Sequence, residues 1–214
     1  PPPPPTPTRC THRRQRQMCI RDRCVALGGD RYSFHAGFLL DPKVDELGKR
    51  IPSRSLFDRD ACIDVFVSRV SRLAVKAKKL GIGLMIENNV LSARNAREFS
   101  SNPLLMCDPQ ECQEIMGLLP DSVKQLIDVA HLKVSANSLN FHPSKMFDLC
   151  NERIAGFHLS DNNGLEDSNK PFGENAWFWP HLKTDVDYYS VEVYGCTPDR
   201  LLQQANLVRS KLGQ

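Results

Sequence analysis

Four side chains that can bind a divalent cation follow one another along the sequence, each at or near the end of a short apolar run. They are Glu87, Asp128, His158 and Glu192. Successive members stand roughly 30 to 40 residues apart, about the length of one strand–helix–strand unit. Each therefore occupies the same place in its own unit, and we expect all four to meet on one rim of a parallel sheet.

Two glutamates, one aspartate and one histidine would form a site of mostly oxygen donors. This set suits Mn²⁺, Co²⁺ or Mg²⁺ and also accepts Zn²⁺. Carboxylates placed this close repel one another unless a cation lies between them, so we predict one divalent metal ion. Such an ion polarises a carbonyl and stabilises the enediolate formed when a neighbouring proton is removed. Either Glu87 or Glu192 can take that proton and return it to the other carbon or the other face.

The most informative stretch is 153–164. Residues 154–159 are mostly strand-forming types, and the turn formers of 160–164 follow at once. A buried strand that delivers His158 and then Asp161 at its carboxyl end is the arrangement with which α/β barrels build active sites. Taken alone, His158 is equally well interpreted as a hydrogen-bonded core histidine. Only the complete set of four favours a site.

The rest of the chain predicts the elements that position these residues. Apolar runs predict strands at 32–40, which carries His35, and at 82–86, 123–129, 154–159 and 188–193. Helices are predicted at 58–80, 108–119, 142–150 and 198–212, and the stretch 92–101 is expected to be looser. Alternation of strand and helix without hairpin signals indicates parallel βα units. The last helix should turn six apolar residues inward: Leu201, Leu202, Ala205, Leu207, Val208 and Leu212.

Composition places the chain among soluble globular proteins. Of its 214 residues, 41% are hydrophobic and 25% charged. No apolar run reaches the roughly 18 residues that span a membrane, and no secretory signal is visible. The eight cysteines are scattered without a Cys-x-x-Cys pair. Reduced thiols, a cytoplasmic location and no membrane partner are therefore expected.

The N-terminal segment carries the positive charge. Residues 1–23 hold six Arg and one Asp, so the remainder is slightly acidic although the formal net charge is +3. A slightly acidic body predicts no nucleic-acid partner. The segment has no periodicity and almost no apolar residue, so we predict that 1–24 is a disordered tail and 25–214 the folded domain. A basic nucleic-acid arm is one interpretation of the tail. The other, favoured here, is translated adapter read-through, which the string Arg-Gln-Arg-Gln-Met-Cys-Ile-Arg-Asp-Arg resembles.

Five motifs together resemble the xylose-isomerase-like barrel superfamily. They are Ile-Glu-Asn-Asn at 86–89, Asp-Val-Ala-His at 128–131, His-Leu-Ser-Asp-Asn at 158–162, Pro-Phe-Gly at 171–173 and Val-Glu-Val-Tyr at 191–194. The resemblance implies a (β/α)8 barrel with the four ligands at the ends of its fifth to eighth strands. It also implies that the two glutamates are the acid–base pair, and that His131 contacts substrate in epimerases or a second metal in endonuclease IV. His35 matches the histidine of the fourth strand, so His35, His131 and Asp161 are the predicted substrate-binding residues.

The chain departs from that family pattern in two places. Only about five βα units are visible, so the expected fold is an incomplete TIM barrel that lacks the first three strands. Asp167-Ser168-Asn169 stands where endonuclease IV has Asp-x-His, and an amide is a poor replacement for imidazole, which argues against a three-metal cluster.

The predicted function is that of a metal-dependent isomerase or epimerase of a small sugar or sugar phosphate, with a homo-oligomer left open. An endonuclease IV-like phosphodiesterase and a barrel that binds without catalysis are the alternatives. Dehydratases and hydroxypyruvate isomerase, which belong to the same superfamily, use the same metal site.

Overall fold

A computed structural model describes residue 24 and residues 26–213 of the chain. The predicted tail, 1–24, therefore lies outside the described residues except for Cys24. The backbone carbonyl of Cys24 accepts hydrogen bonds from the N–H groups of Leu27 and Gly29, at 3.2 and 2.8 Å. The tail and the domain boundary remain predictions.

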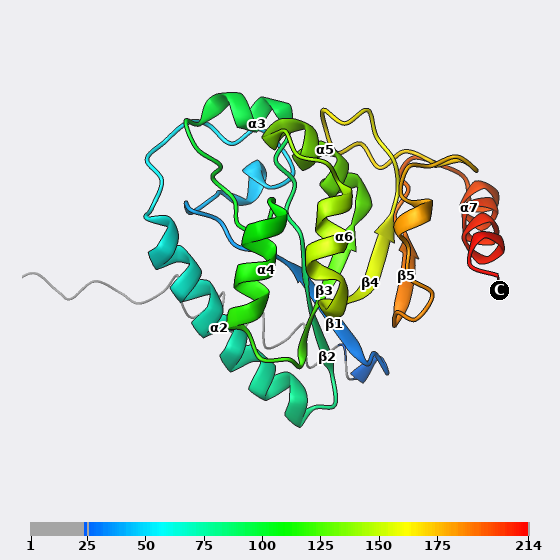
Figure 1. The fold of residues 1–214 in the computed structure, drawn as a ribbon, viewed down its shortest axis with the longest axis horizontal. Coiled ribbons are helices and arrows are strands. Elements are labelled where there is room, and N and C mark those ends of the chain that lie inside the picture. Colours follow the sequence, from blue (N-terminus) through cyan, green and yellow to red (C-terminus); the bar gives the residue numbers. More distant parts are fainter. Residues whose placement is uncertain (1–23, 25, 214) are drawn as a thin grey trace, which may run out of the picture.

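Five parallel strands form one sheet, and each strand pairs with the next one in sequence. They are β1 (Arg31–His35), β2 (Gly83–Glu87), β3 (Val123–Asp128), β4 (Ile154–Leu159) and β5 (Tyr188–Val191). α-Helices lie between successive strands from β1 to β4, whereas only a 3₁₀ turn lies between β4 and β5. Figure 1 shows α4 and α6 lying over the sheet. The prediction of an incomplete TIM barrel with five βα units is confirmed.

The sheet is curled. Arg31 Nε on β1 lies 3.3 Å from Asp187 Oδ2, next to β5, and the side chains of Ser33 and Tyr188 also interact. In a flat sheet with strands about 4.8 Å apart, β1 and β5 would be roughly 19 Å apart. These contacts therefore show that the two edges of the sheet turn toward each other.

Apolar residues next to the predicted ligands fix which way the ligands point. Ile86, Ile127 and Phe157 are fully buried in the main core between the strands and the helices. Neighbouring residues of a strand face opposite sides, so Glu87, Asp128 and His158 face the other way. A register slip of one residue would exchange the two sets, which makes the core responsible for the orientation of the ligands.

Most predicted helices are present. Helix α2 (Arg59–Lys79) begins at Asp58, whose carboxylate accepts a hydrogen bond from Ala61 N at 2.9 Å. The other helices are α3 (Ala93–Glu98), α4 (Pro109–Leu118), α5 (Val129–Leu139), α6 (Ser144–Cys150) and α7 (Pro198–Lys211), with short 3₁₀ turns at Val44–Glu46, Asn151–Arg153 and Trp179–His181. None of the helices in the described part of the chain is long and apolar enough to cross a membrane.

The structure corrects the prediction in three places. The first strand ends at His35 and not at residue 40, because the backbone N–H groups of Leu39 and Leu105 bond to the carbonyls of Pro103 and Gly37. The sequence does not predict α5, because its first turns are buried almost all round and show no amphipathic stripe. The stretch 92–101 was expected to be loose and contains α3.

The inner face of helix α7 differs from the prediction. Leu202, expected inside, is 57% exposed, whereas Gln204 is buried. The amide of Gln204 accepts a hydrogen bond from Phe172 N at 2.8 Å and donates one to Phe172 O at 3.1 Å. Leu201, Gln204 and Val208 share one helical stripe, and Leu202 lies off it.

Candidate metal centre

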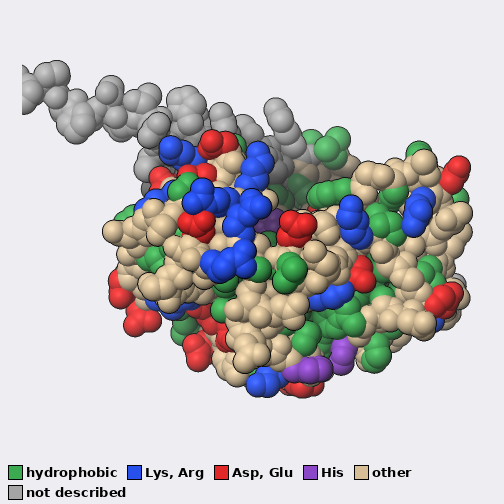
Figure 2. All heavy atoms as spheres, turned by 90° about the horizontal axis from the view of Figure 1, so that it is seen from above, with side chains coloured by type: hydrophobic (Ala, Val, Ile, Leu, Met, Phe, Trp, Pro, Cys, Tyr) green, Lys and Arg blue, Asp and Glu red, His purple; other side chains and the backbone are tan. Residues whose placement is uncertain are grey.

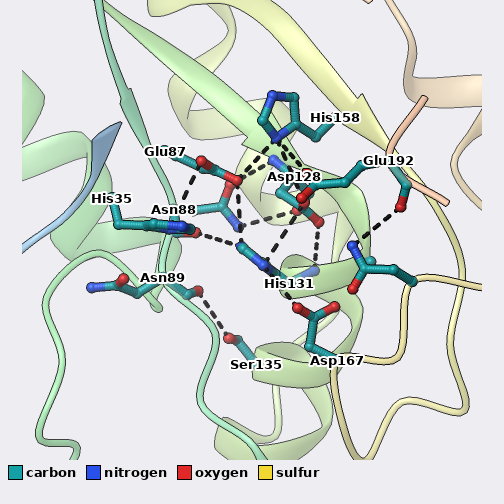
Figure 3. A network of polar contacts seen from close by, with 12 residues as sticks. His35, Glu87, Asn88, Asn89, Asp128, His131, Ser135, His158, Asp167 and Glu192 are labelled. Atoms are coloured by element: carbon teal, nitrogen blue, oxygen red, sulfur yellow. Dashed lines mark hydrogen bonds and ion pairs between the residues drawn. The ribbon is translucent and has the colours of Figure 1, made fainter. Parts of the chain in front are cut away.

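The structure brings the four predicted ligands together on the carboxyl rim of the sheet (Figure 3). Glu87, Asp128, His158 and Glu192 each offer one ligand atom, and these four atoms lie within 4.8 Å of one another. Glu87 and Asp128 end β2 and β3, His158 is next to last in β4, and Glu192 directly follows β5. Parallel strands present their carboxyl ends at the same rim, which explains the convergence.

The Nδ1 atom of His158 is the centre of this group. It lies 2.8 Å from Glu192 Oε2, 3.1 Å from Glu87 Oε1 and 3.9 Å from Asp128 Oδ2. A ring N–H cannot donate good hydrogen bonds to three carboxylates at once. The arrangement therefore has the character of a coordination site for a cation more than of an ordinary hydrogen-bond network.

Asp128 provides the test of whether a cation fits. Its side chain is fully buried, and its Oδ1 accepts a hydrogen bond from His131 N at 2.8 Å. Its Oδ2 is buried and has no hydrogen-bond partner among the described residues. A buried carboxylate oxygen without a partner costs free energy, which a bound cation would offset. Three carboxylates and one imidazole suit a divalent ion, so the donor set fits.

The charges of the group are strongly coupled. Burial raises the pKa of Asp128 to about 6. Burial alone would lower the pKa of His158, but its contacts with Glu192 and Glu87 raise that pKa to about 10. The hydrogen bond with His158, aided by one from Tyr194, lowers the pKa of Glu192 to about 2. His158 thus compensates the carboxylates as an imidazolium; a metal ion would supply that compensation and take the neutral ring as a ligand.

A second group shares Glu87. His35, Glu87 and His131 also offer ligand atoms within 4.8 Å of one another. The Nδ1 atoms of His35 and His131 lie 3.8 Å from Glu87 Oε2 and Oε1, respectively. Burial alone would raise the pKa of Glu87, but the hydrogen bond with His158 and the charges of His35 and His131 lower it. Two of the predicted substrate-binding residues, His35 and His131, therefore flank the metal group.

The His131 ring is fixed at both nitrogens. Nδ1 lies 3.0 Å from Asn88 O, and Nε2 lies 3.2 Å from Asp167 Oδ2. Burial alone would lower the pKa of His131, but Asp128 and Asp167 raise it to about 10. A ring held in this way has one orientation toward a ligand on the rim.

Asp161 lies outside this convergence. Its Oδ1 accepts a hydrogen bond from Lys133 Nζ at 2.6 Å, and its backbone pairs in both directions with Lys170. These contacts hold the loop after β4 together, and the predicted role of Asp161 in substrate binding stays a prediction.

Three supporting residues were not predicted as site residues. The amide of Asn88 accepts from Asp128 N at 2.8 Å and donates to Asp128 O at 3.1 Å, joining the ends of β2 and β3. Tyr194 donates its hydroxyl hydrogen to Glu192 Oε1 at 2.6 Å, and Asp167 fixes His131. All three lie in or beside the motifs, but the sequence does not show which backbone or ring each one contacts.

Asn169, predicted not to be a metal ligand, supports the backbone near Glu192. Its side-chain amide donates to Glu192 O at 3.1 Å, and its own carbonyl accepts from Tyr194 N at 3.0 Å. Its φ of 43° is left-handed, a conformation that Asn tolerates better than most residues. Asn169 thus has a role in holding the end of β5.

Comparison with solved structures shows the same fold in several proteins. A D-tagatose 3-epimerase-like protein is 19% identical with a TM-score of 0.65, over 96% of this chain and 72% of that chain. The IOLI protein with a zinc atom is 12% identical with a TM-score of 0.65, over 97% and 72%. An AP endonuclease of family 2 from Brucella melitensis is 14% identical with a TM-score of 0.61, over 94% and 69%. No curated protein matches the chain.

The family comparison covers most of the chain. Residues 2–189 match the xylose isomerase-like TIM barrel family, and the match takes in the stretch interpreted above as read-through. The motifs at 86–89, 128–131, 158–162 and 171–173 lie inside the matched range. The predicted family is confirmed: the chain belongs to the xylose isomerase-like TIM barrel family.

Proposed function

We propose that this rim is the active centre of a divalent-metal-dependent isomerase or epimerase of a sugar or sugar phosphate, working by proton transfer through an enediolate. The approach of Glu87, Asp128, His158 and Glu192 to within 4.8 Å of one another is the observation that carries the proposal. The buried Oδ2 of Asp128, which has no hydrogen-bond partner in the described part of the chain, supports a cation among them. Similarity to a D-tagatose 3-epimerase-like protein and to a D-psicose 3-epimerase supports the reaction class.

The four residues would hold one ion, which is Mn²⁺, Co²⁺, Mg²⁺ or Zn²⁺ on the chemistry of the donors. When bound, the ion would supply Lewis acidity toward a substrate carbonyl. Two similar structures contain or were soaked with zinc, which supports a divalent ion without selecting it.

Glu87 and Glu192 would move the proton. Their oxygens contact the same His158 nitrogen, at 3.1 and 2.8 Å, so two carboxylates border one position. Both pKa values lie below the ordinary value, so both groups are ionised at neutral pH, which is the state that a general base requires. One removes the proton from the carbon beside the carbonyl, and the other returns a proton to the neighbouring carbon or to the opposite face.

His35 and His131 would bind the substrate. His131 is buried with its ring fixed by Asn88 and Asp167, whereas the His35 side chain is 56% exposed. Both rings border Glu87, where a sugar hydroxyl would lie. Asp161 would also bind the substrate only if its ion pair with Lys133 were replaced by a contact with the substrate.

Turnover in deuterated water tests the proposal. The protein, loaded in turn with each divalent ion, is incubated with a panel of ketoses and ketose phosphates, and products are analysed by NMR. We expect the product to carry deuterium at the carbon to which the proton is returned, which is the neighbouring carbon in an isomerase and the same carbon in an epimerase. Efficient isomerisation with no deuterium would instead indicate a hydride shift, and the two glutamates would then be ligands without being bases.

The second group of donors favours one alternative. His35, Glu87 and His131 could hold a further ion, as a metal-dependent phosphodiesterase of the AP endonuclease type would require. Asn169, engaged with Glu192 O, counts against a third ion. Elemental analysis distinguishes the two functions, since one ion per chain supports the isomerase and three zinc ions per chain support the nuclease.

The proposed substrate is a small molecule, with neither nucleic acid nor a membrane as partner. We propose a cytoplasmic location, because all six cysteines in the described part of the chain are free thiols.

A further inference from the structure

A hollow opens on the surface of the segments that follow β1 and β2. It has a volume of about 630 Å³ and is bounded by the loop after β1 and by the start of α3. Four basic side chains and two acidic ones line it: Lys43, Lys49, Arg50, Arg94, Asp45 and Glu46. Figure 2, which looks onto the end of the molecule at which the strands of Figure 1 finish, shows Lys and Arg side chains gathered there.

The carboxylate of Glu46 is bound by other residues of its own loop. Arg54 donates to its two oxygens at 3.0 and 2.6 Å, and Lys43 N donates to Oε2 at 2.7 Å. The hydrogen bond with Arg54 lowers the pKa of Glu46 to about 2, so the group stays ionised and paired. Glu46 therefore offers little negative charge to the hollow.

Most of the basic side chains of the hollow are not neutralised by an ion pair with another described residue. Arg50 pairs with Glu98, with Nε lying 2.5 Å from Oε1. Lys43, Lys49 and Arg94 form no ion pair with any residue that the structure describes. Asp45 is the acidic wall residue without an ion pair in the same part of the chain. The hollow therefore keeps an excess of positive charge, which an anion would neutralise.

The wall is held in place before any ligand binds. Asn95 is buried; its Oδ1 accepts from Ile51 N at 3.0 Å, and its Nδ2 donates to Lys49 O at 3.1 Å. These bonds fix the backbone of the loop against α3, which carries Arg94. Preorganised cations lose less entropy when an anion binds than cations on a free loop.

The hollow is built from the loops that leave the rim of the metal centre. Lys43 lies in the segment that begins after His35, the last residue of β1. Arg94 lies in α3, which follows Glu87, the last residue of β2. In TIM barrels the loops after the strands build the active site. A substrate that reaches Glu87 and His35 from this side would pass the loops that line the hollow.

We propose that this hollow binds the phosphoryl group of a sugar phosphate through Lys43, Lys49 and Arg94, so that the substrate of the proposed function is phosphorylated. The inference rests on the proposed function for the position of the sugar, but the anion site itself stands on the hollow and its charges. A nucleic-acid backbone would need a longer basic stripe, and the body of the chain is slightly acidic.

Phosphate binding to single variants tests the proposal. Inorganic phosphate, a ketopentose 5-phosphate and the unphosphorylated ketopentose are titrated into the metal-loaded protein by calorimetry. Lys49→Gln and Arg94→Gln should each weaken binding of both phosphate compounds about tenfold. Asp45→Asn removes the opposing charge and should tighten binding by about threefold. Lys79→Gln, at the far end of α2, removes the same charge as Lys49→Gln and should change nothing.

The outcomes separate the two proposals. Equal affinity for the ketopentose and its phosphate, with metal-dependent exchange of the sugar's hydrogen, would overturn the phosphoryl site and leave the proposed function. Phosphate binding that follows the variants in a protein without turnover would support the site and count against the function. Phosphate affinity that is the same in all three variants would overturn the sugar-phosphate assignment. Tight, strongly salt-dependent binding of duplex DNA that is weakened by Lys49→Gln and Arg94→Gln would also overturn it.

Discussion

Glu87 and Glu192 contact the same histidine but lie in different surroundings. The Glu87 side chain is 6% exposed and borders two further histidines, whereas Glu192 is 29% exposed and is held by Tyr194. The buried carboxylate of Glu87 therefore lies next to the rings of His35 and His131, and the carboxylate of Glu192 faces solvent. In the proposed mechanism, Glu87 would make the first proton transfer and Glu192 would exchange its proton with water.

Neutral substitution of either glutamate should reduce catalysis. Glu87→Gln and Glu192→Gln keep the shape of the side chain and remove the titrating group, so turnover should fall by roughly 10² to 10⁴. Loosening of the metal would add to this loss. Initial rates on a ketose or ketose phosphate under saturating metal measure the effect. Glu152→Gln, an exposed change outside the site, is the control. Unchanged turnover in either site variant would remove that glutamate from the acid–base pair.

His158 and His131 should have different roles. His158→Ala removes the only nitrogen donor of the four-ligand group and should abolish most of the metal affinity, measured by competition with a chromogenic chelator. His131→Ala should raise KM more than it lowers kcat, because the proposed function gives this ring a role in substrate binding. A large loss of metal from His131→Ala would instead assign this residue to a second ion.

At the scale of elements, the sequence predicts the alternation of strands and helices, but it does not predict every helix or every side-chain contact. The apolar runs that end at or near Glu87, Asp128 and His158 predict the strands, and the spacing of the ligands predicts the rim. Helix α5 was missed because burial on all sides removes the polar face that marks a helix. The partners of Asn88 and Tyr194 could not be predicted, because a side-chain hydrogen bond depends on distances that no local pattern contains.

Gln204 is a polar residue on the inner face of α7, and its hydrogen bonds with Phe172 should stabilise the fold. Gln204→Leu would strengthen the apolar pattern but leave the N–H and C=O of Phe172 without their partner. Each buried group left unpaired costs about 1–3 kcal/mol, so the free energy of unfolding should decrease. Urea unfolding measures it, with the exposed Gln203→Leu as the matched control. Equal or greater stability in Gln204→Leu would show that the hydrogen bonds contribute nothing net.

At the scale of the molecule, four consecutive βα units each supply one ligand, so a bound ion should stabilise the whole domain. With metal at 100 times its Kd, the free energy of unfolding should rise by about 2.7 kcal/mol. Asp128→Asn should remove this gain, since it deletes the buried charge while an Asn oxygen can still accept from His131 N. Urea midpoints with metal and with chelator measure both effects. A metal-induced rise that persists in Asp128→Asn would place the ion elsewhere.

The contact between Arg31 and Asp187 has a consequence for the order of folding. It joins the first strand to the last, so it closes a loop of nearly the whole described chain and costs more entropy than any pairing of successive strands. Pairs β1–β2 to β4–β5 can form as each unit arrives, but this closure must wait for β5. Glu192, the last ligand, arrives with the same strand. Completion of the metal site and closure of the sheet are therefore expected in one late step, which places metal affinity among the last properties that a refolding chain acquires.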